Sequence, residues 1–164
     1  MILRYTICFI EKNGQLLLLY RNKAPNQFKW NGVGGKIEKD ETPYESIKRE
    51  IVEETGLEVK NVSFRGIVTW NNESGMYVFV GNGVHGDLIE GPEGKLAWKS
   101  INWLNESEEA VSNIKYFIND ILHGDKVIEH SFQYTSEGEI ILYEQKPLTT
   151  DFTQSVYKQK LVKS

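Results

Sequence analysis

Residues 35–57 read GKIEKDETPYESIKREIVEETGL, and the fold and the function both depend on this stretch. Thr42, Pro43 and Glu45 have the pattern of a capping box at a helix start, with proline at the first helical position. Gly56 supplies a residue that readily takes the left-handed conformation in which many helices end. We therefore predict a helix over residues 43–55.

Three carboxylates stand close together on this predicted helix. Glu50, Glu53 and Glu54 occupy positions i, i+3 and i+4, which places neighbouring side chains within about 5 to 6 Å on one side of a helix. One interpretation is a solvated acidic face that Lys48 and Arg49 partly neutralise. The other is a site for Mg²⁺ or Mn²⁺, because these cations prefer carboxylate oxygens.

A glycine-rich segment, Asn31 to Lys36 (NGVGGK), directly precedes the acidic stretch. Its glycines let backbone groups come close to a ligand or a metal ion. Neither the P-loop order nor the dinucleotide-binding order of glycines is present. Glycine-rich turns are common in loops without a function. The segment is evidence for a ligand or metal site because it directly precedes the three carboxylates.

The rest of the chain predicts strands around a second helix. Three pairs of apolar runs bracket turn residues and are predicted hairpins: 3–10 with 15–20, 64–70 with 76–80, and 127–134 with 139–144. Apolar residues at helical spacing predict one amphipathic helix over residues 106–122, ending before Gly124. Strands and helices without regular alternation indicate an α+β layered fold with a mixed sheet.

Length and composition indicate one globular domain. The chain has 164 residues, of which 40% are hydrophobic and 26% charged. Its net charge of −4 argues against nucleic-acid polymers and anionic membranes as partners. No apolar run approaches the length of a membrane span, and the first residues lack the order of a signal peptide, so the expected compartment is the cytoplasm.

Other catalytic side chains are sparse. The single cysteine, Cys8, lies in the apolar run TICFI and is expected to be a small buried hydrophobic residue. His85, His123 and His130 are isolated from one another in the sequence. Catalysis by a cysteine or histidine nucleophile therefore has little support.

Taken together, residues 35–57 match the pattern G-x5-E-x7-R-E-U-x-E-E-x-G-U, with U aliphatic, at every defined position. This stretch resembles the Nudix box. The resemblance implies an α/β/α sandwich with a mixed sheet, and hydrolysis of nucleoside diphosphates linked to another group, with Mg²⁺ or Mn²⁺ as cofactor. A domain over residues 1–146 is expected, with residues 147–164 as an unassigned C-terminal extension.

The resemblance also implies roles for residues of the box. Glu53 and Glu54 correspond to metal ligands, and Glu50 to a ligand or a general base. The backbone carbonyl of Gly34 is expected to complete the metal shell. Arg49 and Glu41 are the expected supports of the site, with Arg49 pairing with the box carboxylates.

Similarity extends beyond the box to MutT-like oxidised-purine nucleoside triphosphatases, which convert 8-oxo-dGTP to the monophosphate and pyrophosphate. The corresponding pieces are Tyr5-Thr6, WNGVGGK at 30–36, and Pro92-Glu93 with Trp98. The resemblance implies that Glu93 approaches the metals. It implies substrate contacts for these residues: Thr6, Arg21, Asn31, Gly35 and Lys36.

One element of that group is missing. Its Trp-Pro-Asp-Asp base-recognition sequence is absent before the late helix, where this chain has Ala110 to Asn113. Asn113 can hydrogen-bond a purine edge, or it can be an exposed polar residue of the helix. Three functions therefore stay open: a purine nucleoside triphosphate pyrophosphohydrolase, which is favoured; a Nudix enzyme for ADP-ribose, dinucleoside polyphosphates or capped nucleic acid; and a non-catalytic nucleotide-binding module. The sequence leaves the oligomeric state open.

Overall fold

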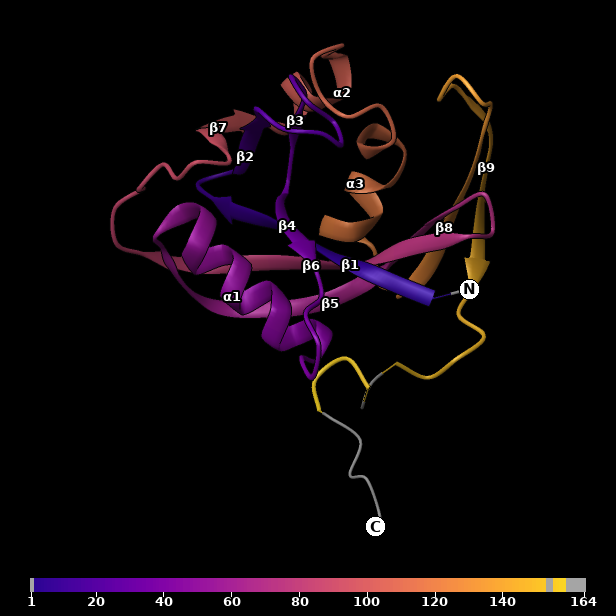
Figure 1. Cartoon of the computed structure of the whole chain (residues 1–164), viewed down its shortest axis with the longest axis horizontal. Helices are drawn as coiled ribbons and strands as arrows, with labels where there is room; N and C mark the ends of the chain where they lie inside the picture. The colour runs from indigo at the N-terminus through magenta and orange to yellow at the C-terminus, as the bar shows by residue number, and fades with distance from the viewer. Residues whose placement is uncertain (1, 153–154, 159–164) are drawn as a thin grey trace.

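The computed structural model describes residues 2–152 and 155–158 (Figure 1). Its elements, in order, are β1 (Ile2–Lys12), β2 (Gln15–Arg21), β3 (Trp30–Asn31), β4 (Val33–Lys36), α1 (Pro43–Thr55), β5 (Glu58–Trp70), β6 (Ser74–His85), β7 (Gly94–Ser100), α2 (Ile101–Glu106), α3 (Ile114–His123), β8 (Ile128–Tyr134) and β9 (Ile140–Pro147). Within these ranges no helix is both long enough and apolar enough to cross a membrane.

The strands form one mixed sheet. Its main order is β3-β2-β1-β6-β5-β8-β9, with β4 paired to β1 and β7 paired to β2. The β1–β6 and β5–β8 pairs are parallel, and the other pairs are antiparallel. All three predicted hairpins are confirmed, as β1–β2, β5–β6 and β8–β9. Asn13 and Gly14 have φ of 53° and 75° in the first turn, the positive values that a tight hairpin requires.

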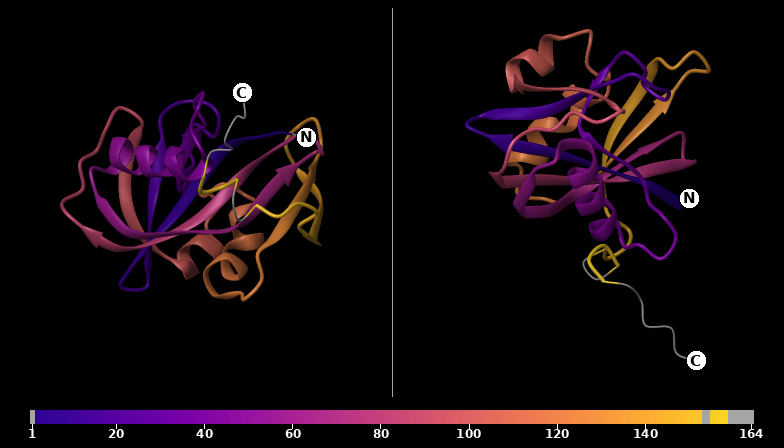
Figure 2. Two further views of the ribbon diagram at one scale, coloured as in Figure 1. Left: turned by 90° about the horizontal axis from the view of Figure 1, so that it is seen from below. Right: turned by 60° about the vertical axis from the view of Figure 1, so that its left-hand side comes forward.

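The sheet is covered on both faces, and the alternation along β1 shows how. Ile7 and Phe9 belong to the core on the side of α3, whereas Cys8 and Ile10 belong to the core on the side of α1. Successive side chains of a strand point to opposite faces, so a strand that is apolar throughout is buried between two helical layers (Figures 1 and 2). The predicted α/β/α sandwich is confirmed, as is the burial of Cys8, which raises the pKa of its thiol.

Helix α1 begins and ends where the local signals predict. The Thr42 hydroxyl accepts from the Glu45 N–H at 3.0 Å, and the Glu45 carboxylate accepts from the Thr42 N–H at 3.0 Å. At the other end Gly56 has φ 71°, and its N–H donates to the Val52 carbonyl at 3.0 Å. Both ends are therefore fixed by named hydrogen bonds.

The prediction of one helix over residues 106–122 is wrong in its first half. The chain forms α2 up to Glu106, then runs without helix, and α3 begins only at Ile114. In between, Val111 donates its N–H to the Trp30 carbonyl and the Trp30 N–H donates to Glu109, both at 2.9 Å. This bridge to β3 uses backbone groups that a helix would have paired internally, so the long-range contact overrides the periodicity.

Candidate active site

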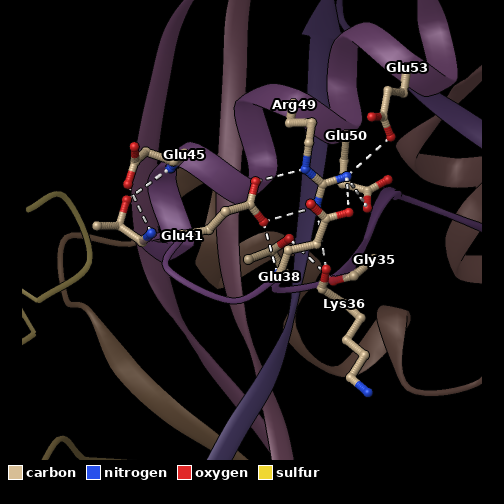
Figure 3. A network of polar contacts seen from close by, with 10 residues as sticks. Gly35, Lys36, Glu38, Glu41, Glu45, Arg49, Glu50 and Glu53 are labelled. Atoms are coloured by element: carbon tan, nitrogen blue, oxygen red, sulfur yellow. Dashed lines mark hydrogen bonds and ion pairs between the residues drawn. The ribbon is translucent and has the colours of Figure 1, made fainter. Parts of the chain in front are cut away.

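Arg49 is the centre of the acidic network on α1 (Figure 3). Its Nε and Nη2 donate to the two carboxylate oxygens of Glu41 at 2.7 and 3.0 Å, which is a two-pronged contact. Its Nη1 donates to Glu50 Oε1 and to Glu53 Oε2, each at 3.1 Å. The guanidinium lowers the pKa of Glu41, and the paired carboxylates raise the pKa of Arg49.

Glu54 points into the protein. It follows Ile47 and Ile51 at helical spacing on the buried face of α1, and only 4% of its surface is exposed. Burial, followed by the negative charge of Glu50, raises the pKa of Glu54 to about 8. A buried carboxylate lowers the stability of the fold unless a partner compensates its charge. An apolar side chain at this position would therefore stabilise the fold better than the acid does.

The glycine segment lies directly against the carboxylates. The Gly34 N–H donates to Glu54 Oε2 at 2.9 Å. A Cβ on Gly35 would lie 2.5 Å from Glu50 Oε1, a distance that real Cβ atoms essentially never show. The glycine therefore makes room for the Glu50 side chain, whose pKa is raised by its own burial.

Two further predicted residues act on Glu54 through their charges, from the neighbouring ends of β2 and β7. The charge of Arg21, at the end of β2, lowers the pKa of Glu54, and the charge of Glu93 raises it. The ends of β2 and β7 hold them there, because the Asn22 N–H donates to the Glu93 carbonyl at 3.1 Å and Arg21 pairs with Gly94. Arg21 itself donates from Nε to the Pro25 carbonyl at 2.8 Å.

Thr6 and Lys36 lie beside this group in different ways. Thr6 is buried in β1 opposite Gly35, and its hydroxyl donates to the Gly35 carbonyl at 3.4 Å. The Lys36 carbonyl accepts from Arg49 Nη2 at 3.4 Å, whereas its side chain extends away from the carboxylates (Figure 3). Lys36 thus contacts the network through its backbone.

Asn31 and Asn113 belong to the two segments that the bridge between Trp30 and Ala110 joins. Asn31 follows Trp30 in β3, and its Oδ1 accepts from the Gly32 N–H at 2.9 Å. Asn113 is only 7% exposed, precedes α3, and has a side-chain oxygen with no hydrogen-bond partner. Of the two possibilities in the sequence, the exposed helical position is therefore wrong, because the residue is buried and precedes the first residue of α3.

Two residues near the site were missed. Glu38 lies 3.6 Å from Arg49 Nη1 and adds a fourth acidic group around it, at a position of the box that the pattern leaves undefined. Its spacing from Glu41 is the available signal, because the Glu38 N–H donates to Glu41 Oε1 at 2.9 Å. The second is Tyr134 on β8, whose pKa is raised by burial while the Asn113 side chain opposes that rise. No local pattern indicates this long-range pair.

The carboxylates suit a divalent cation by their chemistry. In the described residues, no three His, Cys, Asp or Glu side chains form a ready metal site, because Arg49 holds Glu50 and Glu53 while the Gly34 N–H holds Glu54. The donors are nevertheless all oxygens, as Mg²⁺ and Mn²⁺ prefer. A cation would also compensate the buried Glu54, whose pKa is raised first by burial and then by the negative charge of Glu50.

His130 offers no alternative centre. It is 1% exposed, its Nδ1 lies 2.7 Å from the Tyr143 hydroxyl, and burial lowers its pKa. Its ring packs on Phe117, which belongs to the same core cluster as Phe132. His130 is therefore a core residue on the face of the sheet opposite α1.

Comparison with known proteins agrees with this geometry. A family model described as the NUDIX domain matches residues 2–121. The uncharacterised Nudix hydrolase YvcI of Bacillus subtilis is 29% identical over 153 residues, which cover 88% of this chain and 94% of that protein. The oxidized purine nucleoside triphosphate hydrolase of Mus musculus is 24% identical over 144 residues, covering 85% and 91% of the two chains.

Solved structures give the same answer. The crystal structure of a MutT protein from Bacillus halodurans superposes with a TM-score of 0.75 at 30% identity, covering 88% of this chain and 97% of that one. Nudix hydrolases generally use divalent metal ions. The match to the family model spans most of the chain, and three acids of the box lie on one helix. This chain therefore belongs to the NUDIX family of hydrolases, which act on the phosphoanhydride bonds of nucleotides.

Proposed function

We propose that this chain is a metal-dependent nucleoside triphosphate pyrophosphohydrolase, which releases a nucleoside monophosphate and pyrophosphate. The observation that carries the proposal is the buried carboxylate of Glu54, held by the Gly34 N–H beside Glu50. An acid on the core face of a helix costs stability. That cost is understandable if the acid holds a cation against a polyphosphate.

Mg²⁺ or Mn²⁺ would be held by Glu50, Glu53 and Glu54 with the Gly34 carbonyl, and Glu93 would approach it. When bound, such a cation neutralises phosphate oxygens and stabilises charge on the leaving pyrophosphate. The donors are pre-assembled on one rigid helix and one strand end. The net charge of −4 supports a small nucleotide as substrate in preference to a nucleic-acid polymer.

Arg49, Glu50 and Arg21 have different proposed roles around the cation. Arg49, held by both oxygens of Glu41, fixes Glu50 and Glu53 relative to each other. Glu50 has a raised pKa, which brings a carboxylate closer to the range useful for taking a proton from water. It can therefore serve as a general base or as a ligand. Arg21, whose charge opposes the rise in the pKa of Glu54 that burial causes, would meet the phosphates.

For the base, the favoured substrate is 8-oxo-dGTP or a related purine nucleotide. The free, buried Oδ1 of Asn113 supports this choice, because an unpaired polar atom in a buried place is rare and is satisfied by a donor on a ligand. Asn31 lies in β3, which the bridge from Trp30 to Ala110 joins to the segment before α3, and Thr6 lies in β1 opposite Gly35. The mouse and zebrafish relatives, at 24% and 26% identity, carry the name oxidized purine nucleoside triphosphate hydrolase.

A substrate panel tests the proposal. The purified protein is assayed with Mg²⁺ on 8-oxo-dGTP, dGTP, dATP, dCTP, ADP-ribose and a dinucleoside polyphosphate, with products identified by chromatography. We expect kcat/KM to be highest for 8-oxo-dGTP, with monophosphate and pyrophosphate as products. Preference for ADP-ribose or the dinucleotide would reject the purine triphosphate assignment, and the absence of turnover on all of them would favour a binding module.

Two variants make the panel specific for the pocket. Asn31→Ala and Asn113→Ala remove side chains that can pair with a purine edge, so selectivity among the bases should fall. Glu58→Gln, an exposed change on β5, serves as the control. An unchanged ranking of bases in both pocket variants would remove these two residues from base recognition.

A further inference from the structure

The first turn of α1 depends on the end of the chain for one of its hydrogen bonds. The N–H groups at the start of a helix have no partner within it. Here Glu45 and Ser46 donate to the hydroxyl and the carbonyl of Thr42 at 3.0 and 2.9 Å, and the proline at the first position has no N–H. The remaining donor, the Tyr44 N–H, is bound by the Val156 carbonyl at 2.9 Å.

Val156 is also part of the core beneath α1. It is 0% exposed and belongs to the same cluster as Ile47 and Ile51, the buried residues of the helix. Its N–H donates to the Phe152 carbonyl at 3.0 Å. The side chain and both backbone groups of this residue are therefore engaged, although the sequence around it is mostly polar.

Tyr157 ties the same segment to the helix and to the sheet. Its ring centre lies 5.1 Å from that of Tyr44, in the first turn of α1. Its hydroxyl accepts from the Phe64 N–H of β5 at 2.8 Å. Phe152 adds ring contacts with Phe64 and Tyr77, at 6.1 and 5.8 Å between centres. Figures 1 and 2 show the segment passing under the N-terminal end of α1.

We propose that residues 148–152 and 155–158, here called the C-terminal strap, position the catalytic helix, with Val156 and Tyr157 as positioning residues. This proposal rests on the proposed function, because Glu50, Glu53 and Glu54 lie on that helix. The strap fixes the start of α1 on the sheet, and the helix transmits that placement to the carboxylates. A shift of about 1 Å in a catalytic group can cost on the order of 10²-fold in rate.

The test uses point variants in the full chain. Val156→Ala removes packing under the helix, Tyr157→Ala removes the ring and the hydroxyl, and Tyr157→Phe keeps the ring on Tyr44. We expect Val156→Ala and Tyr157→Ala to lower kcat on the order of 10-fold with KM nearly unchanged, because the carboxylates move but the base pocket does not. Tyr157→Phe should keep most of the activity.

The matched control is Ile121→Val, a change in the core on the opposite face of the sheet. Ile121 lies in α3 and is 1% exposed, so its truncation lowers stability without touching α1. All variants are assayed well below their melting temperatures. If Val156→Ala loses melting temperature as Ile121→Val does while kcat stays at the wild-type value, the strap is a structural element only and the proposal is wrong.

Two readouts do not need turnover. Hydrogen exchange at the Tyr44 amide reports whether the strap holds the helix start, and Mn²⁺ titration reports the placement of the carboxylates. In Val156→Ala and Tyr157→Ala we expect faster exchange and several-fold weaker Mn²⁺ binding. If the wild type hydrolyses no nucleotide, the proposed function fails, but these two readouts still test the role of the strap. Unchanged exchange and Mn²⁺ affinity in the variants would overturn that role, whereas faster exchange and weaker Mn²⁺ binding would support it.

Discussion

Helix α1 and the segment that leads into α3 have similar apolar periodicity but different ends. Helix α1 starts at a capping box and stops at a left-handed glycine. Helix α3 starts at Ile114, and Asn113 before it has helical φ and ψ with no side-chain cap bond. The difference shows that local hydrogen bonds fix the boundaries of one helix, whereas contacts with β3 fix the boundary of the other. The strongly specified helix carries the proposed ligands of the cation, and the weakly specified segment lies at the proposed base pocket.

The largest expected effect is on the chemistry of α1. Glu53→Gln keeps the shape of the side chain but removes the charge that a hard cation prefers. The rate should fall on the order of 10²-fold or more, at least as much as the loss of one general base. Folding should survive, because 58% of the Glu53 side chain is exposed. Steady-state kinetics beside Glu58→Gln check this, and unchanged turnover would remove Glu53 from the site.

The next effect concerns the buried acid. Burial raises the pKa of Glu54 to about 8, so the folded protein holds a proton that the unfolded chain releases near its ordinary pKa. Stability from this group is present at low pH and is lost as pH rises towards 8. In chelator the free energy of unfolding should therefore fall by a few kcal/mol over that range.

Urea titrations between pH 5 and 8 measure this slope, with Glu54→Gln as the comparison. The variant keeps a neutral side chain at every pH, so its slope should be much smaller. Mg²⁺ should restore the stability of the wild type at pH 8 by binding the charged form. Equal slopes in wild type and variant would show that Glu54 ionises normally.

Glycine conformation gives a third comparison, at the end of α1. Gly56→Val places a β-branched residue at φ 71° and a Cβ 3.0 Å from Ile89, so stability should fall by roughly 1 to 2 kcal/mol. Activity should fall with it, because the helix end moves.

The control is Gly138→Val, because Gly138 has a similar φ of 84° and lies in open space at a hairpin tip. It should lose stability through strain but keep kcat; the same kcat loss in both would contradict this reading.

The smallest expected effect is on stability, in a direct comparison of the starts of α1 and α3. Thr42→Ala removes the hydroxyl that accepts from the Glu45 N–H, which is half of the capping box, and should cost about 1 kcal/mol. Asn113→Ala removes no cap bond, so its cost should be smaller, while base selectivity changes. Thermal unfolding of the two variants side by side measures the contrast. A larger loss for Asn113→Ala would mean that its side chain supports the fold more than the pocket.

The sequence was most informative where structure is local. The capping box of Thr42 and Glu45, the turn at Asn13-Gly14 and the left-handed Gly56 are each set by neighbouring residues. The family and its fold followed from the spacing of the box, because those residues lie on one helix. Their roles as ligands or base remain predictions, although the structure brings the box acids, Gly34 and Arg49 together.

The sequence was least informative where distant segments meet. Where a continuous helix was predicted, the bridge from Trp30 to Ala110 lies in a non-helical segment between α2 and α3. The burial of Val156 depends on a surface formed by α1 and β5, which its polar neighbours do not reveal. The pair of Asn113 and Tyr134 joins a loop to β8. Each of these contacts depends on how the layers pack, which no local pattern encodes.

The central claim is that the acids of α1 hold a cation for cleavage of a nucleoside triphosphate. Pyrophosphate release from 8-oxo-dGTP and dGTP, measured in Mg²⁺, in EDTA and after Mg²⁺ or Mn²⁺ is restored, tests it most directly. The account predicts monophosphate and pyrophosphate in equal amounts with Mg²⁺, no turnover in EDTA, and recovery with either cation. Full turnover in chelator after exhaustive metal removal would contradict it.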